Sequence, residues 1–367
     1  MLPTQQIESA LKTGIASGIF PGAAIAVVEG REIIAKASAG RATYAEWSPA
    51  VTTETIFDLA SLTKPLVTAL TIAALYAQGM IQLSDTIAKY LHPTNPVFEK
   101  VTLRQLLAHA SGLPAHKPLY NIIALKPENI KKSILSKSIL AASAQKLPDE
   151  TIIYSDLGYM LLGIIVEKIT SMPLCKAWEK LIQSPLEIKE LFFPSSIEQP
   201  AELSHFTPTE LCPVRKKVIW GEVHDLNCWA LGGVAGHAGL FGSAVGVAKM
   251  LIKILQILKG SLKKSLIPPE IMHLFLSPVQ AQDGTKRALG FDIPSPSGSQ
   301  AGTYFKPEHT VGHLGFTGTS FWLDIQKEVG IVLLTNRTFP KATQETQKKM
   351  AEFRPYMNDF IWNALFC

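Results

Sequence analysis

Cysteine is scarce in this chain, and its positions indicate no disulfide framework. Cys175, Cys212, Cys228 and Cys367 are the four cysteines among 367 residues, and no two of them form a C-x-x-C pair. The pattern favours a reducing compartment, in which each cysteine is expected to be a small buried side chain.

Long apolar runs are also absent. The N-terminus has no basic region followed by an apolar stretch, and the apolar residues 19–28 are too few to cross a bilayer. No other segment reaches the roughly 18 uninterrupted apolar residues of a membrane helix. We therefore expect no membrane insertion and a cytoplasmic protein; export would require a leader that has been removed.

No charge of one sign dominates, and no nucleotide-binding pattern is present. The 35 basic and 30 acidic residues leave a net charge of +5, and the densest basic spots, 215–217 and 263–264, are too short for a nucleic-acid groove. The chain lacks a G-x-S-x-G elbow, a phosphate-binding G-x-x-x-x-G-K-[ST] loop and a dinucleotide fingerprint. A small-molecule partner is therefore expected and a nucleic acid is not, while the oligomeric state is left open.

The sequence does contain a serine and a lysine three positions apart, Ser61 and Lys64, directly before an apolar helix. On one helical turn the two side chains face the same way, so a lysine can be the base that activates a serine hydroxyl. Backbone N–H groups near a helix N-terminus also stabilise developing negative charge. The same spacing at 143–146 and 261–264 lacks this setting. Ser61 is the predicted nucleophile and Lys64 the predicted base.

Two further segments carry groups that suit such a site. Tyr154 precedes an apolar helix and has a phenol that can relay protons, although 356–358 hold a competing Tyr-x-Asn. The glycine-rich residues 312–319 run into a strand, where a substrate can approach closely and receive a backbone N–H. The plainer interpretations are a half-buried packing tyrosine and a glycine-rich turn with a hydrogen-bonded His313.

A metal site is a further alternative for the histidines of the second half. His224, Asp225 and His237 are the imaginable ligands, but regular spacing and a fourth ligand are missing. A glycine-rich loop that borders a cleft is the preferred interpretation, and we expect no metal.

Hydrophobic patterns predict the order of helices and strands. Short apolar runs bounded by turn residues predict two β-hairpins, at 23–39 and 320–335. Helical spacing marks 5–17, 343–365 and most of 65–200. Hairpins at both ends with helices between them predict an α/β lobe built from both termini, 1–64 with 201–367, and a mainly helical lobe, 65–200. The active site is expected in the cleft between them.

Taken together and in this order, the motifs resemble the serine β-lactamase and penicillin-binding-protein superfamily. The likeness is greatest to its branch of class C β-lactamases, D-alanyl-D-alanine carboxypeptidases and esterases of the same fold. The resemblance covers nearly the whole chain and rests on Ser61 with Lys64 and on the segments 106–114, 154–163, 221–241, 312–324 and 333–337. It implies an α/β (α+β) fold, with an antiparallel sheet flanked by N- and C-terminal helices and an inserted all-helical lobe.

The resemblance also implies catalytic roles. Ser61 forms an acyl-enzyme, and Lys64 with Tyr154 shuttles the proton. The backbone N–H groups of Ser61 and Phe316 form the oxyanion hole. Water then hydrolyses the ester intermediate, and no metal or organic cofactor is required.

On the substrate side, the resemblance places Asp156 opposite the acyl-side amide. His313 and Gly315 belong to the strand that walls the site, and Thr317 can bind a substrate carboxylate. Two of these positions depart from the common motifs, because Lys is usual at His313 and Asn is usual at Asp156. His313 is expected to be mostly neutral, and an ionised Asp156 keeps Lys64 protonated.

Both departures are expected to make the site more negative, which favours neutral esters or amides, or substrates with an amino group, over penicillins. The predicted function is a serine hydrolase of ester or amide bonds, with esterase and D-Ala-D-Ala carboxypeptidase-like peptidase as close rivals and β-lactamase third. A catalytically silent penicillin-binding-like protein is the alternative from another class. The presence of Ser61, Lys64 and Tyr154 argues against it.

Overall fold

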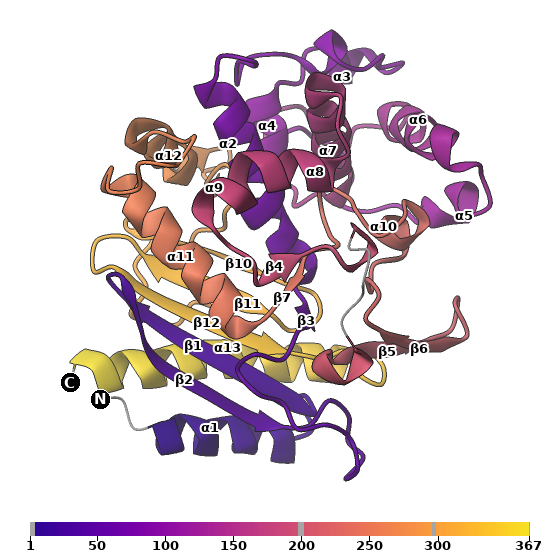
Figure 1. Ribbon diagram of the computed structural model, residues 1–367. Helices are drawn as coiled ribbons and strands as arrows, with labels where there is room; N and C mark the ends of the chain where they lie inside the picture. The colour runs from indigo at the N-terminus through magenta and orange to yellow at the C-terminus, as the bar shows by residue number, and fades with distance from the viewer. Residues whose placement is uncertain (1–3, 197–201, 296–298, 367) are drawn as a thin grey trace.

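The computed structural model describes residues 4–196, 202–295 and 299–366 (Figure 1). Its centre is a five-stranded antiparallel sheet that joins the two ends of the chain. The strands, in spatial order, are β10 (Thr310–Leu314), β11 (Ser320–Asp324), β12 (Val329–Thr335), β1 (Gly22–Glu29) and β2 (Glu32–Gly40). The predicted hairpins are β1–β2 and β11–β12, and the predicted α/β fold is confirmed.

Both faces of the sheet are buried, because successive side chains of a strand point to opposite sides. In β1, Ala24, Ala26 and Val28 pack in the core that also contains helix α11 (Ala244–Leu258). Their neighbours Ala23, Ile25 and Val27 pack on the other side. A strand covered on both faces is apolar at every position, which explains the unbroken run in the sequence.

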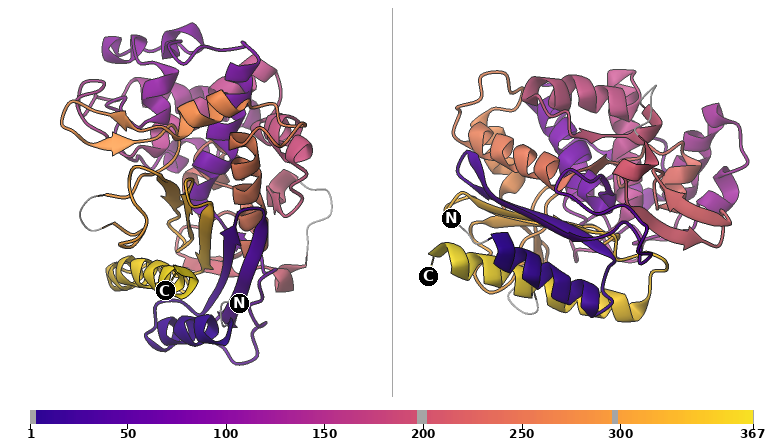
Figure 2. Two further views of the ribbon diagram at one scale, coloured as in Figure 1. Left: turned by 90° about the vertical axis from the view of Figure 1, so that its left-hand side faces the viewer. Right: turned by 60° about the horizontal axis from the view of Figure 1, so that its bottom comes forward.

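The outer face is covered by the first and last helices, α1 (Thr4–Ala16) and α13 (Gln344–Phe366), which lie side by side (Figure 2). A T-shaped contact joins Phe20, which follows α1, to Phe353 of α13, with ring centroids 5.3 Å apart. Farther along α13, Arg354 donates to the carbonyl of Gly315, which directly follows β10. The terminal helix thus also contacts the edge of the sheet where the candidate site lies.

The middle of the chain is mainly helical. Its helices are α2 (Leu70–Ala77), α3 (Pro96–Glu99), α4 (Leu103–Leu107), α5 (Tyr120–Ile123), α6 (Glu128–Leu140), α7 (Asp156–Thr170), α8 (Leu174–Trp178) and α9 (Ser184–Leu186), with α10 (Leu226–Ala230) and α12 (Pro269–Leu276) following later. One apolar core runs from the inner face of the sheet into these helices, so the division at 64/65 and 200/201 stays a prediction. Within the described part of 65–200 the one strand is β4 (Leu191–Phe192).

Three short strands tie this helical part to the segment before Ser61. β7 (Phe241–Gly242) pairs with both β3 (Phe57–Asp58) and β4. The remaining strands form two small hairpins, β5 (Pro208–Cys212) with β6 (Lys217–Trp220) and β8 (Val279–Gln280) with β9 (Lys286–Arg287).

One helical run, residues 60–77, has the length and composition of a membrane span, but 78% of it is buried inside the protein, as in a core helix. Cys212 and Cys228 are buried and Cys175 is half-buried, all three with free thiols. Cys367 lies outside the described residues.

Candidate active site

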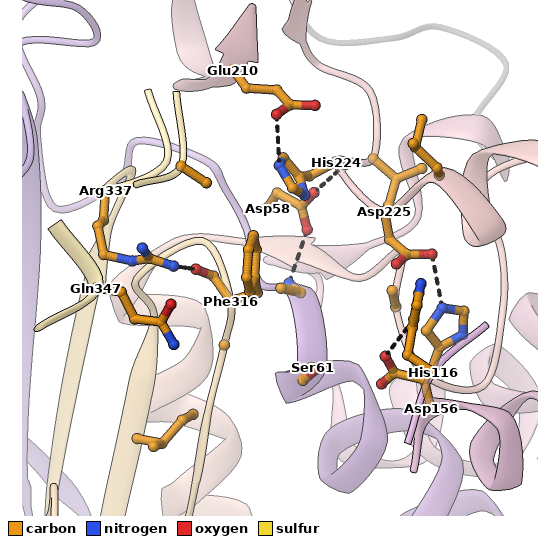
Figure 3. A pocket seen from close by; sticks show the side chains of 18 of the residues that line it. Asp58, Ser61, His116, Asp156, Glu210, His224, Asp225, Phe316, Arg337 and Gln347 are labelled. Atoms are coloured by element: carbon orange, nitrogen blue, oxygen red, sulfur yellow. Dashed lines mark hydrogen bonds and ion pairs between the residues drawn. The ribbon is translucent and has the colours of Figure 1, made fainter. Parts of the chain in front are cut away.

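Ser61 lies in a short 3₁₀ turn, Ala60–Leu62, at the end of strand β3. A π-helical turn, Lys64–Ala69, follows and leads into α2. Ala60 has a φ of +47°, a left-handed conformation that costs energy in a residue with a side chain. The Asp58 carboxylate stabilises this turn by accepting the Ala60 N–H at 2.9 Å. The strained turn presents Ser61 to the pocket (Figure 3).

The predicted base lies beside the predicted nucleophile. Lys64 Nζ donates to Ser61 Oγ at 2.9 Å and to Asp156 Oδ1 at 2.7 Å, and its side chain is fully buried. Burial opposes the ammonium charge, but the nearby Asp156 carboxylate outweighs it, and the pKa of Lys64 is raised. The resting lysine is therefore an ammonium that donates to Ser61, as the sequence argument from Asp156 expected.

Asp156 is the first residue of α7, and Ser155 caps that helix by accepting the Gly158 N–H. Burial raises the pKa of the Asp156 carboxyl, but Lys64 and the hydrogen bond with His116 outweigh this effect and hold it well below its usual range. Lys64 and Asp156 thus form a partly buried ion pair, with His116 Nδ1 at 3.4 Å from the second carboxylate oxygen.

Tyr154 faces two cations. Lys64 Nζ lies 4.7 Å from the centroid of its ring, and the guanidinium carbon of Arg287 lies 5.0 Å from the same point. Both cations lie over the aromatic ring, whose face attracts positive charge. Ser61, Lys64 and Tyr154 are therefore brought together, while their catalytic roles stay predictions.

The loop after β10 is held against the segment that carries Ser61. Thr317 Oγ1 donates to the Asp58 carbonyl at 2.8 Å, and Thr319 Oγ1 donates to the Leu59 carbonyl at 3.2 Å. The Thr317 hydroxyl is buried in this contact, so the structure gives it a positioning contact in place of the predicted carboxylate contact. A Cβ at Gly315 would overlap Thr319 Oγ1 and come within 2.8 Å of the Leu59 carbonyl oxygen. Glycine at 315 therefore permits this close approach.

Two buried arginines hold the same loop from the other side. Arg354 of α13 donates to the carbonyls of Gly315 and Thr319, each at 3.1 Å. Arg337, which follows β12, donates to the Phe316 carbonyl. The half-exposed Phe316 ring lies between the Arg337 guanidinium and the His224 ring, 5.2 and 5.4 Å away. These contacts fix the peptide whose N–H is predicted to bind the oxyanion.

His313 is neutral and points its ring toward an unexpected cation. Its Nδ1 donates to the Leu314 carbonyl at 2.8 Å, and its Nε2 lies 3.4 Å from Arg287 Nη2. Burial, with the Arg287 charge, holds the pKa of His313 well below its usual range. Arg287 brings a positive charge beside the position where Lys is usual, but it also lies 3.5 Å from Asp292 Oδ1, so the expectation that this end of the site becomes more negative stays a prediction. No sequence motif pointed to Arg287, which precedes His313 by 26 positions.

The pocket around Ser61 has a volume of about 850 Å³. Arg337 lies at one side of the pocket (Figure 3). Glu210 and Asp58 lie above Ser61, and Asp225 and Asp156 lie on the other side. Of the four histidines that line the pocket, three lie beside a carboxylate: His116 with Asp156 at 3.4 Å, His224 with Glu210 at 3.3 Å, and His237 with Asp225 at 2.8 Å. In the part of the chain that the structure describes, no group of three or more such side chains is arranged to hold a metal ion.

The competing motifs lack comparable surroundings. Lys146 and Lys264 are exposed and pair with Glu150 and Glu187 on the surface. Tyr356 is half-exposed on the terminal helix. His109 has a structural contact, since its Nδ1 accepts the Ser155 N–H at 2.9 Å.

Comparison with known proteins gives the family. The sequence model described as Beta-lactamase matches residues 7–353. An N-acetylmuramyl-L-alanine amidase of Bacillus subtilis (strain 168) is 33% identical over 91% of this chain and 80% of its own length. A putative D-alanyl-D-alanine carboxypeptidase of Salmonella agona (strain SL483) is 31% identical over 78% of this chain and 70% of its own length.

Solved structures share the fold at lower identity. An octameric penicillin-binding protein homologue from Pyrococcus abyssi is 20% identical with a TM-score of 0.75, over 98% of this chain and 78% of its own. The hydrolase EstCE1, which has promiscuous acyltransferase activity, is 18% identical with a TM-score of 0.70, over 96% and 98%. A class C β-lactamase from Rhodobacter sphaeroides is 18% identical with a TM-score of 0.69, over 96% and 99%. The chain belongs to the β-lactamase family, whose members include hydrolases.

Proposed function

We propose that the protein is a serine amidase that hydrolyses the bond between N-acetylmuramic acid and L-alanine in fragments of peptidoglycan. The observation that carries the chemistry is the contact of a buried Lys64 with Ser61 Oγ inside a pocket of about 850 Å³. The substrate is suggested by the amidase that is 33% identical over most of both chains. A pocket of this size is within the range of sites that enclose a small molecule.

In the proposed acylation, Ser61 Oγ attacks the carbonyl carbon of the amide. Tyr154 takes part as its phenolate, having lost its own proton to solvent, and the proton of Ser61 Oγ passes to the phenolate oxygen, because Lys64 already carries a proton in the ion pair with Asp156. The N–H groups of Ser61 and Phe316 stabilise the oxyanion. The C–N bond then breaks, and the leaving amino group of L-alanine takes the proton from Tyr154.

Deacylation reverses the same proton path. A water molecule attacks the ester carbonyl carbon and gives its proton to Tyr154, and Ser61 Oγ leaves and recovers that proton. The products are N-acetylmuramic acid and a peptide with a free amino group.

The test is incubation with muramyl dipeptide, followed by liquid chromatography and mass spectrometry. We expect equimolar N-acetylmuramic acid and L-alanyl-D-isoglutamine, and no products from Ser61→Ala. Ser143→Ala is the matched control, since Ser143 has the same spacing to a lysine that pairs on the surface. Intact muramyl dipeptide after prolonged incubation, with an enzyme that still hydrolyses p-nitrophenyl butyrate, would refute the amidase proposal.

A D-alanyl-D-alanine carboxypeptidase is the second candidate, supported by Arg287. This guanidinium lines the pocket beside Tyr154 and His313 and lies 3.5 Å from Asp292 Oδ1, and its remaining N–H groups can bind the terminal carboxylate of a peptide. The same mass-spectrometric assay with a D-Ala-D-Ala peptide and with benzylpenicillin decides between the candidates. Release of D-alanine, or a persistent penicillin adduct on Ser61, would favour the carboxypeptidase.

A further inference from the structure

The pocket has a wall of histidine–carboxylate pairs that the proposed chemistry does not use. Glu210 and His224 form one pair, and Asp225 and His237 form another. In Figure 3, Glu210, His224 and Asp225 lie above and beside Ser61, on the opposite side from Arg337. These four residues, which we call the histidine–carboxylate wall, all line the cavity.

The wall is built into the fold. Arg215 donates to the carbonyls of Val223 and His224, at 2.7 and 2.8 Å, and the His224 N–H donates to Asp58 Oδ2 at 2.7 Å. Asp225 caps helix α10 by accepting the Cys228 N–H at 2.7 Å. Side chains held in this way are preorganised, so a ligand that binds them loses little free energy to ordering.

The wall offers both hydrogen-bond acceptors and hydrogen-bond donors, and its two carboxylates disfavour a negatively charged ligand. Asp225 uses Oδ1 for both His237 and the Cys228 N–H, and Glu210 Oε2 lies 3.3 Å from His224 Nε2. The second oxygen of each carboxylate remains as an acceptor for a ligand. His237 Nδ1 is buried in the wall and has no hydrogen-bond partner among the described residues. Such a surface suits neutral groups that donate and accept hydrogen bonds at several points, as sugar hydroxyls do.

We propose that the histidine–carboxylate wall binds the sugar half of the substrate, an N-acetylated amino sugar, and thereby selects amides of muramic acid over amides of plain acyl groups. The inference rests on the proposed amidase function and adds the residues that determine its specificity. The peptide half of the substrate is anionic. The carboxylates of Glu210 and Asp225 repel it, so it is expected to lie toward Arg337, on the opposite side of the pocket.

The kinetic test compares two substrates that differ only in the sugar, muramyl dipeptide and D-lactoyl-L-alanyl-D-isoglutamine. The wild-type protein is expected to prefer muramyl dipeptide by at least about tenfold in kcat/KM, the effect of one good hydrogen bond to a charged group. Glu210→Gln is expected to raise KM for muramyl dipeptide by about tenfold and to reduce the preference. Glu222→Gln is the matched control, since Glu222 pairs with Lys217 on the surface.

A binding test separates this inference from the amidase proposal. In the Ser61→Ala background, calorimetry with N-acetylmuramic acid alone should show binding that Glu210→Gln weakens and Glu222→Gln does not. Binding without any hydrolysis by the wild-type protein would refute the amidase and support the wall. Equal kcat/KM for both substrates, equal loss on both in Glu210→Gln, or preference for an aminoacyl substrate with an ammonium group would overturn the wall.

Discussion

The Lys64–Asp156 pair gives the sharpest prediction, the effect of Asp156→Asn. The substitution preserves shape and removes a negative charge 2.7 Å from Lys64 Nζ. At this distance and an effective dielectric constant of about 20, the attraction is about 6 kcal/mol before solvation is counted. The buried ammonium then has no counter-ion, so it should release its proton at lower pH. Neutral Lys64 can then take the proton of Ser61 in place of Tyr154, and the rising limb of the kcat/KM profile should move toward acid.

The assay is hydrolysis of p-nitrophenyl butyrate from mildly acidic to alkaline pH, with active-site titration to correct for folded protein. Asp85→Asn is the matched control, because Asp85 pairs with the exposed Lys89 on the surface. An unshifted limb, or a limb displaced toward alkaline pH, would refute the view that Asp156 holds the proton on Lys64.

The same pair predicts how stability depends on pH. The pKa of Asp156 is lowered by folding, so its contribution is present above its unfolded pKa of about 3.9 and is lost as pH falls toward the folded value. The pKa of Lys64 is raised, so its contribution is present below its unfolded pKa of about 10.4 and is lost as pH rises through the folded value. Asp156→Asn should flatten both limbs in urea unfolding followed at a series of pH values.

Three further substitutions test the loop, the cation and the core. Thr317→Val, which removes the hydrogen bond to the Asp58 carbonyl, should lower kcat by about tenfold with little change in KM, and an effect confined to KM would contradict the positioning role. Arg287→Gln should lower kcat/KM about tenfold more for substrates with a carboxylate than for p-nitrophenyl butyrate; equal losses would show that it acts through Tyr154 alone. Ile25→Ala, in the buried centre of β1, should cost about 2–5 kcal/mol of unfolding free energy in urea, and a cost near zero would contradict the packing.

The sequence predicts what depends on local pattern. Both hairpins, the terminal helices and the proximity of Ser61 to Lys64 follow from periodicity and from three-residue spacing. It does not show that β1 pairs with β12, because that contact joins residues about 300 positions apart, such as Ile25 and Leu333. Nor does it show which way a side chain points, so Thr317 was predicted at the substrate although its hydroxyl bonds to Asp58.

The site residues that the sequence did not reveal contact the site from distant parts of the chain. Arg287 reaches His313 from the β9 hairpin, and Arg354 reaches Gly315 from the terminal helix. Neither arginine belongs to a sequence motif, because an arginine at many different positions in the chain could contact the same loop. His116 follows the Ser-Gly-Leu-Pro turn closely, and that proximity to a recognised segment was the one available signal. The cytoplasmic location, the absence of a cofactor and the catalytic roles stay predictions.

The two departures from the common motifs are linked through Tyr154. Asp156 keeps Lys64 charged, and the neutral His313 lets the Arg287 guanidinium lie beside it without repulsion between two cations. Both cations therefore face the Tyr154 ring, at 4.7 and 5.0 Å. In a site with Asn at 156 and Lys at 313, Lys64 would have no carboxylate partner at 156. It would then accept more of the proton transfer from Ser61, and Tyr154 less. Replacing one position alone should then impair catalysis more than replacing both, which a double-mutant cycle with Asp156→Asn and His313→Lys measures directly.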